Sequence, residues 1–194
     1  LSVDLDATGD GVPDVMGTYS YNAEYFVVVL DDMLERDLDT PLARIRHSPP
    51  FSFLFPQSDL NGDGIVDLVI GGNVRRPLVL AYGPFEGELS TDTLEDARIE
   101  PTTWWYRLDE VHSLGDVNKD GHMDLGVAGE VPAGDFMAVF HGPLHGTYTL
   151  EDADWIVWED TINGLAFVPV GDLNGDDHAD LWLTAGSESY VLYG

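Results

Sequence analysis

Four short acidic loops carry the residues of this chain that could bind a metal ion. Each loop spans nine residues and places oxygen-bearing side chains at its first, third, fifth and ninth positions, while the seventh position can add its backbone carbonyl oxygen. A hard cation of the size of calcium takes about six to eight oxygen ligands, which a sharply turning loop can supply. The spacing therefore predicts up to four Ca²⁺ ions. The predicted ligands are Asp6, Thr8, Asp10, Val12 and Asp14; Asp59, Asn61, Asp63, Ile65 and Asp67; Asp116, Asn118, Asp120, His122 and Asp124; and Asp172, Asn174, Asp176, His178 and Asp180.

The sixth position of each loop is expected to turn sharply. Glycine tolerates the left-handed backbone conformation and occupies this position in the first three loops, as Gly11, Gly64 and Gly121. Asp177 replaces it in the fourth loop, and Asp is among the other residues that tolerate this conformation best. In the first loop, Thr8 offers a hydroxyl group where the other loops offer an amide oxygen. We therefore expect the first and fourth loops to bind more weakly than the others.

Two alternatives to a calcium loop of this kind fit the sequence less well. Four solvated acidic turns without a metal would fit the composition, but the same spacing repeated four times argues against them. An EF-hand loop lies between helices and ends in a bidentate Glu at its twelfth position. The residues at that position here are Gly17, Ile70, Val127 and Leu183.

The loops belong to a repeated unit. Asp10, Asp63, Asp120 and Asp176 follow one another at intervals of 53, 57 and 56 residues. Two further motifs recur in the same order: Gly-Pro-Phe-Glu-Gly at 83–87 matches Gly-Pro-Leu-His-Gly at 142–146, and Thr-Leu-Glu-Asp-Ala at 93–97 recurs at 149–153. We therefore predict one domain, residues 1–194, made of four repeats that start near residues 1, 51, 109 and 165.

Short apolar runs flank the loops and indicate β-strands, because they are rich in β-branched and aromatic residues and are bounded by Gly, Pro and Asp. A helical pattern at 31–39 carries less weight, because a Gly-Pro loop occupies the same place in the later repeats. Four strands per repeat, stacked radially, predict an all-β propeller of four-stranded blades. The runs lie at 1–3, 53–55, 111–114 and 166–170 before the loops, at 68–70 after the second loop, and then at 78–82, 136–140, 190–193, 104–106 and 155–158.

Residues 59–68 (Asp-Leu-Asn-Gly-Asp-Gly-Ile-Val-Asp-Leu), followed by the Tyr-Gly-Pro turn at 82–84, resemble the FG-GAP repeats of integrin α-subunit propellers and related repeats of bacterial secreted surface proteins. The resemblance implies a calcium-binding, non-catalytic β-propeller at the cell surface that binds a protein or glycan in adhesion. Propellers of this family usually have seven blades. Residues 1–194 supply about 3.75 blades by our count of strands, and an open propeller exposes sheet edges. We expect the remaining blades or a partner chain to close the ring; a compact four-bladed ring is the alternative.

Composition narrows the range of partners. The chain has 194 residues, a formal net charge of −28 and an apolar content of 44%, which suits a folded domain with an acidic surface. Such a surface repels nucleic acid and anionic membranes, so neither is an expected partner. The chain has no cysteine and no apolar stretch long enough for a membrane span. We expect an extracellular location, where free calcium is high enough to fill such loops.

No catalytic residues are predicted, and we expect no enzymatic activity from this chain. The six histidines lack zinc-ligand spacing and are expected in surface loops, and neither a Gly-x-Ser-x-Gly elbow nor a phosphate-binding glycine loop occurs. A glycosidase pair of carboxylates is recognised by its separation in space, so an accessory or partial propeller of a secreted carbohydrate-active enzyme is the alternative function. The aromatic residues at 104–106, Trp155, Trp158 and Trp182 are expected to pack between blades, although an exposed Trp could contact a ligand.

Overall fold

The computed structural model describes residues 6–21, 24–31, 41–47, 53–56, 59–71, 77–100, 107–159 and 165–194. Within these ranges the chain is all-β, as predicted, with one single-turn 3-10 helix, η1 (Leu150–Asp152). The candidate strands at 1–3 and 104–106 lie outside the described residues, as does the helical pattern at 32–39, while Asp31 ends a strand. The strands are β1 (Asp14–Tyr21), β2 (Glu24–Asp31), β3 (Ala43–His47), β4 (Phe53–Pro56), β5 (Leu68–Gly71), β6 (Leu78–Ala81), β7 (Gly87–Ser90), β8 (Ala97–Glu100), β9 (Arg107–Gly115), β10 (Asp124–Val131), β11 (Gly134–Phe140), β12 (Gly146–Thr149), β13 (Trp155–Glu159), β14 (Leu165–Gly171), β15 (Asp180–Ala185) and β16 (Glu188–Leu192).

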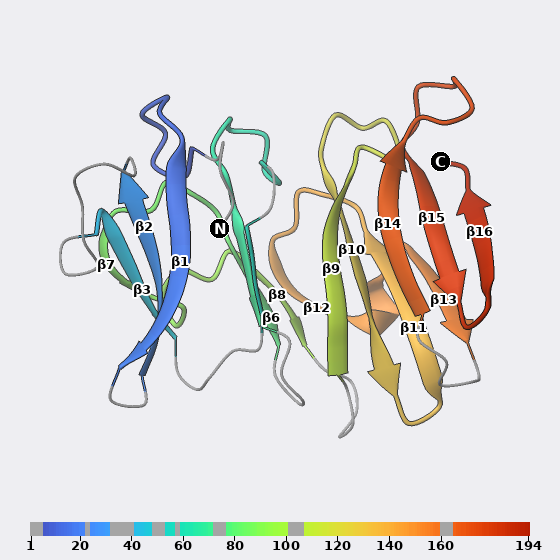
Figure 1. Cartoon of the computed structure of the whole chain (residues 1–194), viewed down its shortest axis with the longest axis horizontal. Coiled ribbons are helices and arrows are strands. Elements are labelled where there is room, and N and C mark those ends of the chain that lie inside the picture. The colour runs from blue at the N-terminus through green and yellow to red at the C-terminus, as the bar shows by residue number, and fades with distance from the viewer. Residues whose placement is uncertain are drawn as a thin grey trace.

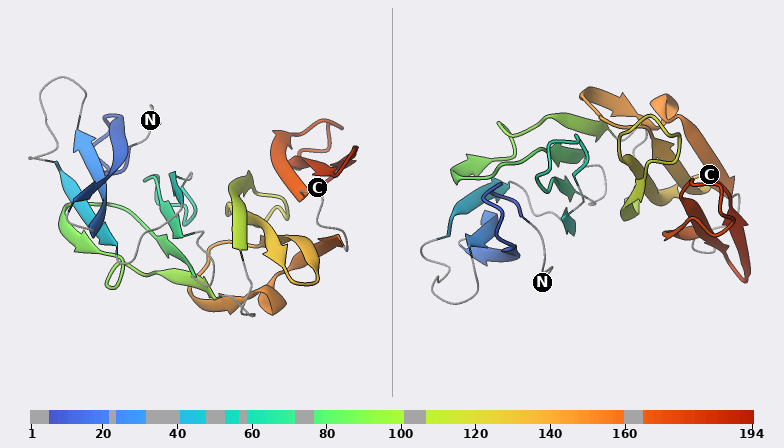
Figure 2. Two further views of the ribbon diagram at one scale, coloured as in Figure 1. Left: turned by 60° about the horizontal axis from the view of Figure 1, so that its bottom comes forward. Right: turned by 90° about the horizontal axis from the view of Figure 1, so that it is seen from above.

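The strands form four sheets that follow one another along an arc (Figures 1 and 2). The first sheet has the order β1-β2-β3-β7, the second β4-β5-β6-β8-β12, the third β9-β10-β11-β13 and the fourth β14-β15-β16. The first and fourth sheets lie at opposite ends of the arc (Figure 2). Each sheet contains antiparallel strands that are close together in the sequence.

Strands β7 and β12 cross from one repeat to the sheet before it. Each begins just after a Gly-Pro sequence and pairs in parallel with the last strand of the preceding repeat, β7 with β3 and β12 with β8. We call β7 and β12 the clasp strands. The prediction of four strands in every blade is therefore wrong for the second sheet, which contains five; within the described ranges the first, third and fourth sheets contain four, four and three strands. The sequence pattern identified the Gly-Pro motif but not the sheet that its strand would join.

Strand β8 pairs with β6 in the second sheet, just as β13, which contains the predicted run at 155–158, pairs with β11 in the third. The other predicted runs among the described residues coincide with strands β4, β5, β6, β9, β11, β14 and β16.

The hydrophobic core is divided into three clusters, each between two successive sheets. Strand β5 shows the alternation that produces them. Leu68 and Ile70 belong to the cluster shared with the first sheet, while Val69 belongs to the cluster shared with the third sheet. All three side chains are fully buried, because β5 has a neighbouring sheet on both faces. A third cluster joins the third and fourth sheets through Phe167 and Met137.

The second residue after each acidic loop faces the following sheet. Met16 packs toward the second sheet and Val69 toward the third, while a side chain on Gly126 would meet the ring of Phe167 in the fourth. Trp182 has this position in β15, and 43% of it is exposed. The part of the chain that the structure describes provides no sheet beyond the fourth to cover it.

The prediction that tryptophans pack between blades is therefore wrong for the three that the structure describes. Trp155 and Trp158 are 40% and 51% exposed. Both lie on β13, the edge strand of the third sheet, where side chains have solvent beside them. Trp158 nevertheless keeps a tilted contact with Phe136, at 5.9 Å between ring centroids.

Candidate metal-binding loops

The four acidic loops lie together at one end of the sheets, at the top of Figure 1. The second loop joins β4 to β5, the third joins β9 to β10 and the fourth joins β14 to β15, while the first leads into β1. Because every loop precedes the same strand of its sheet, the topology brings all four to one edge. The described loops connect strands and not helices, which excludes the EF-hand arrangement for them.

The first carboxylate of each loop organises the turn. In the second loop, the carboxylate of Asp59 accepts hydrogen bonds from the backbone N–H groups of Gly62, Asp63 and Gly64, at 2.6, 2.9 and 2.7 Å. The carboxylate at the fifth loop position, that of Asp63, accepts the backbone N–H of Ile65 at 2.8 Å. In the other loops, backbone N–H groups donate in the same way to the carboxylates at positions one and five, which are Asp6 and Asp10, Asp116 and Asp120, and Asp172 and Asp176.

The carboxylate at the ninth position of a loop has a structural role that the sequence did not predict. Asp67 is fully buried and accepts N–H groups from Leu60, Asn61 and Gly83, the last at the start of the Gly-Pro turn. Asp124 and Asp180 bond in the same way to Gly142 and Gly194. Asp67, Asp124 and Asp180 thus each connect a loop to the chain beyond the next two strands. The number of residues between the two partners differs among the repeats, so no fixed spacing in the sequence could have revealed the bond.

Burial and hydrogen bonding divide the loop carboxylates into two groups by pKa. Burial raises the pKa of Asp67 to about 6, against the lowering effect of its N–H donors, and raises the pKa of Asp14 and Asp124 as well. In contrast, hydrogen bonds lower the pKa of the exposed Asp120 and Asp176. The chief donor is the Asn118 side chain for Asp120 and the His178 backbone for Asp176. Asp120 and Asp176 are therefore ionised at neutral pH.

The sixth position has the predicted left-handed conformation in every loop. Gly11, Gly64 and Gly121 have φ values of 84°, 88° and 95°, and Asp177 has 67°. The turn thus forms with aspartate as well, at the conformational cost that a side chain carries there.

The backbone at position four of every loop is also left-handed, which the sequence did not predict. Glycine occupies it in three loops, but Lys119, the single lysine of the chain, adopts a φ of 61° in the third. Its Nζ donates a hydrogen bond to the backbone oxygen of Asp176 in the fourth loop, at 2.7 Å. Lys119 therefore joins two neighbouring acidic loops.

Other contacts join neighbouring loops in the same way. The backbone N–H of Val66 in the second loop donates to the oxygen of Asp6 in the first, at 2.9 Å. In the fourth loop, Nδ1 of His178 lies 3.1 Å from the backbone oxygen of Val117 in the third. These contacts connect the acidic loops of successive sheets.

Two of the six histidines do not lie in loops, which corrects the expectation from sequence. His47 and His112 lie in strands β3 and β9. His112 meets the ring of Phe167 edge-on across the boundary between the third and fourth sheets, at 5.1 Å between ring centroids.

Among the residues described, no group of three or more His, Asp or Glu side chains converges as a metal site. The loop carboxylates bond instead to N–H groups of their own loop. The chemistry of the donor set nevertheless fits calcium, because each loop offers carboxylate oxygens together with an amide or hydroxyl oxygen and no sulfur ligand. Each carboxylate oxygen also has lone pairs beyond those used by the N–H groups.

Residues 59–127 match the family model described as the FG-GAP-like repeat. The chain contains an FG-GAP-like repeat. The matched segment begins at the first residue of the second loop and ends within β10, so the FG-GAP-like repeat includes the second and third loops and the clasp strand β7. The resemblance to FG-GAP repeats predicted from these residues is confirmed. The comparison with curated proteins found no match, and the described residues form no helix long and apolar enough to cross a membrane.

Proposed function

We propose that this chain is a calcium-stabilised, non-catalytic β-propeller module that acts outside the cell and binds a protein or glycan partner. The observation that carries this proposal is the nine-residue acidic loop, found at the same place in four successive sheets and belonging, in two of them, to an FG-GAP-like repeat. We propose further that the four sheets are blades of a larger ring, which the remaining blades or a partner chain completes.

In this proposal the side chains at positions one, three, five and nine of each loop, with the backbone oxygen at position seven, hold the ion. Counting three carboxylates per loop gives 4 × 3 = 12 acidic groups, and four Ca²⁺ ions would change the formal charge from −28 to −28 + 8 = −20. Two carboxylates about 5 Å apart repel by roughly 1 kcal/mol in water and by more near a protein surface. The ion would replace that repulsion by attraction. Because neighbouring loops contact one another, filled loops would also stiffen the junctions between sheets.

Calcium counting tests the proposal. Isothermal titration of the wild-type chain should yield up to four ions per molecule, and Asp63→Ala, which removes the fifth-position ligand of the second loop, should yield one ion fewer. Asp92→Ala is the matched control, because it removes the same charge from an exposed turn outside the loops and should leave the count unchanged. A wild-type chain that binds no calcium, or an Asp63→Ala variant with the full count, would refute the assignment.

A further inference from the structure

Lys119 occupies a backbone position that the other acidic loops give to glycine. It is the fourth residue of the third loop and has a φ of 61°. The other loops have Gly9, Gly62 and Gly175 at this position, with φ values of 77°, 83° and 82°. A side chain in the left-handed conformation costs free energy that glycine avoids. A lysine is therefore unfavourable for the backbone here, which directs attention to what its side chain does.

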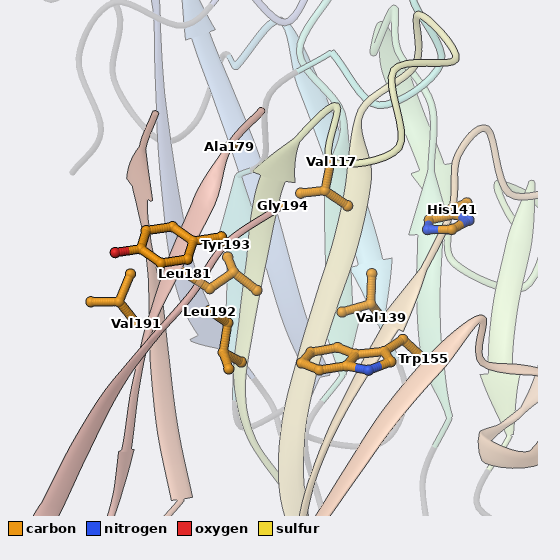
Figure 3. Close-up of a pocket in the computed structure, with 10 residues that line it drawn as sticks. All are labelled: Val117, Val139, His141, Trp155, Ala179, Leu181, Val191, Leu192, Tyr193 and Gly194. Atoms are coloured by element: carbon orange, nitrogen blue, oxygen red, sulfur yellow. The ribbon is translucent and has the colours of Figure 1, made fainter. Parts of the chain in front are cut away.

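The third and fourth loops lie side by side. Val117 of the third loop and Ala179 of the fourth line the same cavity between their sheets (Figure 3). Across this boundary, Nζ of Lys119 donates its hydrogen bond to the backbone oxygen of Asp176, at 2.7 Å. That oxygen belongs to the peptide bond between Asp176 and Asp177. The ammonium group of the third loop therefore lies against the turn of the fourth.

The topology explains why a side chain at position four reaches the next loop. In the first two loops, position four faces position seven of the loop that follows. A β-carbon on Gly9 would lie 2.8 Å from Cδ1 of Ile65, and one on Gly62 would lie 3.9 Å from Nδ1 of His122. Glycine thus leaves this place to the side chain of the next loop. At the third junction, the long side chain of Lys119 extends the other way, onto the fourth loop.

The fourth loop is also the one with an additional carboxylate. Its nine residues include four acidic residues, whereas each of the other loops has three. The additional one is Asp177, which replaces the glycine of position six. The ammonium group of Lys119 changes the formal charge at the fourth loop from −4 to −3, which is the charge of the first and second loops. The charge that the third loop supplies thus matches the one that the fourth loop has in excess.

We propose that Lys119 is a tethered counter-ion of the fourth loop and lowers the affinity of that loop for calcium. This inference rests on the proposed function, since it concerns how one of the calcium sites is adjusted. Without an ion, the ammonium group offsets the repulsion among the carboxylates of the loop. It repels an entering Ca²⁺, and salt screens charges several ångströms apart only in part. The fourth loop therefore fills at a higher calcium concentration than it would with glycine at position 119.

NMR measures the response of the fourth loop in the whole chain. The backbone amide signal of Gly175 reports on this loop, and that of Gly9 in the first loop is the internal reference. Calcium chloride is added stepwise at low salt. Lys119→Gly should lower the calcium concentration that half-shifts the Gly175 signal by about three- to tenfold, as expected for a single and a double charge several ångströms apart in water. The response of Gly9 should not change.

Two further variants separate the charge from the backbone conformation. Lys119→Asn removes the charge but keeps a side chain that tolerates the left-handed conformation, so it should tighten calcium binding as Lys119→Gly does. Lys119→Arg keeps the charge and should bind within about twofold of the wild type. At about 1 M salt the difference between Lys119→Gly and the wild type should shrink, because the Debye length falls to about 3 Å.

Asp177→Gly tests the balance of charge from the other side. It removes the additional carboxylate and should weaken calcium binding by the fourth loop. The double variant Lys119→Gly/Asp177→Gly removes one charge of each sign, so the two effects should oppose each other and return the affinity toward that of the wild type. The melting temperature of each variant in EGTA verifies that it is folded.

Three results would overturn this inference and leave the proposed function standing. They are an unchanged or weaker calcium response of Gly175 in both Lys119→Gly and Lys119→Asn, the same tightening in Lys119→Arg, and a tightening that does not diminish at high salt. A wild-type chain whose loop signals do not respond to calcium would overturn the proposed function and this inference together. The response of the wild type thus distinguishes the two failures.

Discussion

The hydroxyl group of Tyr82, in the second repeat, donates a hydrogen bond to the backbone oxygen of Leu144 in the third, at 2.6 Å. Tyr82 also meets the ring of His145 edge-on, at 5.8 Å between ring centroids. Burial raises the pKa of Tyr82, so the phenol remains a neutral donor at physiological pH. This hydrogen bond holds Leu144 of the third repeat against the sheet of the second.

Replacing Tyr82 by phenylalanine should weaken the junction between the second and third sheets. We expect Tyr82→Phe to lower the free energy of unfolding by roughly 1–2 kcal/mol, because the half-buried oxygen of Leu144 loses its donor. Urea unfolding measures the change. Tyr190→Phe is the control, since Tyr190 bonds to Glu188 of its own exposed strand, and it should have little effect. Equal effects of the two variants would contradict the role of Tyr82.

Removal of calcium should destabilise the whole chain. A site with free calcium at 100 times its dissociation constant adds about 2.7 kcal/mol to the free energy of unfolding, and EGTA removes that contribution from each filled loop. The melting temperature should therefore fall strongly in EGTA and recover when excess calcium is added, but not when excess magnesium is added, since magnesium demands a tighter octahedral site. An unchanged melting temperature in EGTA would contradict calcium stabilisation.

Asp177 should tolerate glycine but not valine. Its φ of 67° lies in the left-handed region, where the other three loops have glycine. A β-branched residue is strongly disfavoured there, so Asp177→Val should lower the free energy of unfolding by about 1–2 kcal/mol. Asp177→Gly should change it by less than about 1 kcal/mol, because relief of the backbone conformation opposes the entropy that glycine gains in the unfolded chain. Asp92→Val, in an exposed turn, controls for the loss of charge. Thermal unfolding in EGTA separates this backbone effect from metal binding.

In the absence of calcium, Asp67 should titrate well above an ordinary aspartate. Burial raises its pKa from 3.8 to about 6, so the folded state binds a proton more readily than the unfolded state. The protonated group favours folding at low pH, and that contribution is lost as the pH rises through about 6. NMR titration of the Asp67 carboxyl carbon in EGTA should give a midpoint near this value.

Asp152 is the matched comparison for that titration. It is exposed, and the Thr149 backbone and hydroxyl group lower its pKa by donating hydrogen bonds. Its midpoint should lie below 3.8. A midpoint for Asp67 at or below that of Asp152 would contradict the effect of burial.

The sequence by itself determined the features that short stretches of chain specify. The loop spacing, the left-handed sixth position and most of the strands follow from contacts within about ten residues, as the hydrogen bonds of Asp59 to Gly62, Asp63 and Gly64 illustrate. The period of the loops likewise fixed the number of repeats and their order.

Only the tertiary structure decided which repeat each segment would pack against. The strand after Gly-Pro joins the preceding sheet, Asp67 bonds to Gly83, and Trp182 has no sheet to cover it among the described residues. Residues far apart in the chain meet in each of these cases, and the apolar pattern of a strand is the same whichever sheet it joins. Sequence periodicity records that a side chain is apolar; the arrangement of the sheets decides whether another repeat buries it.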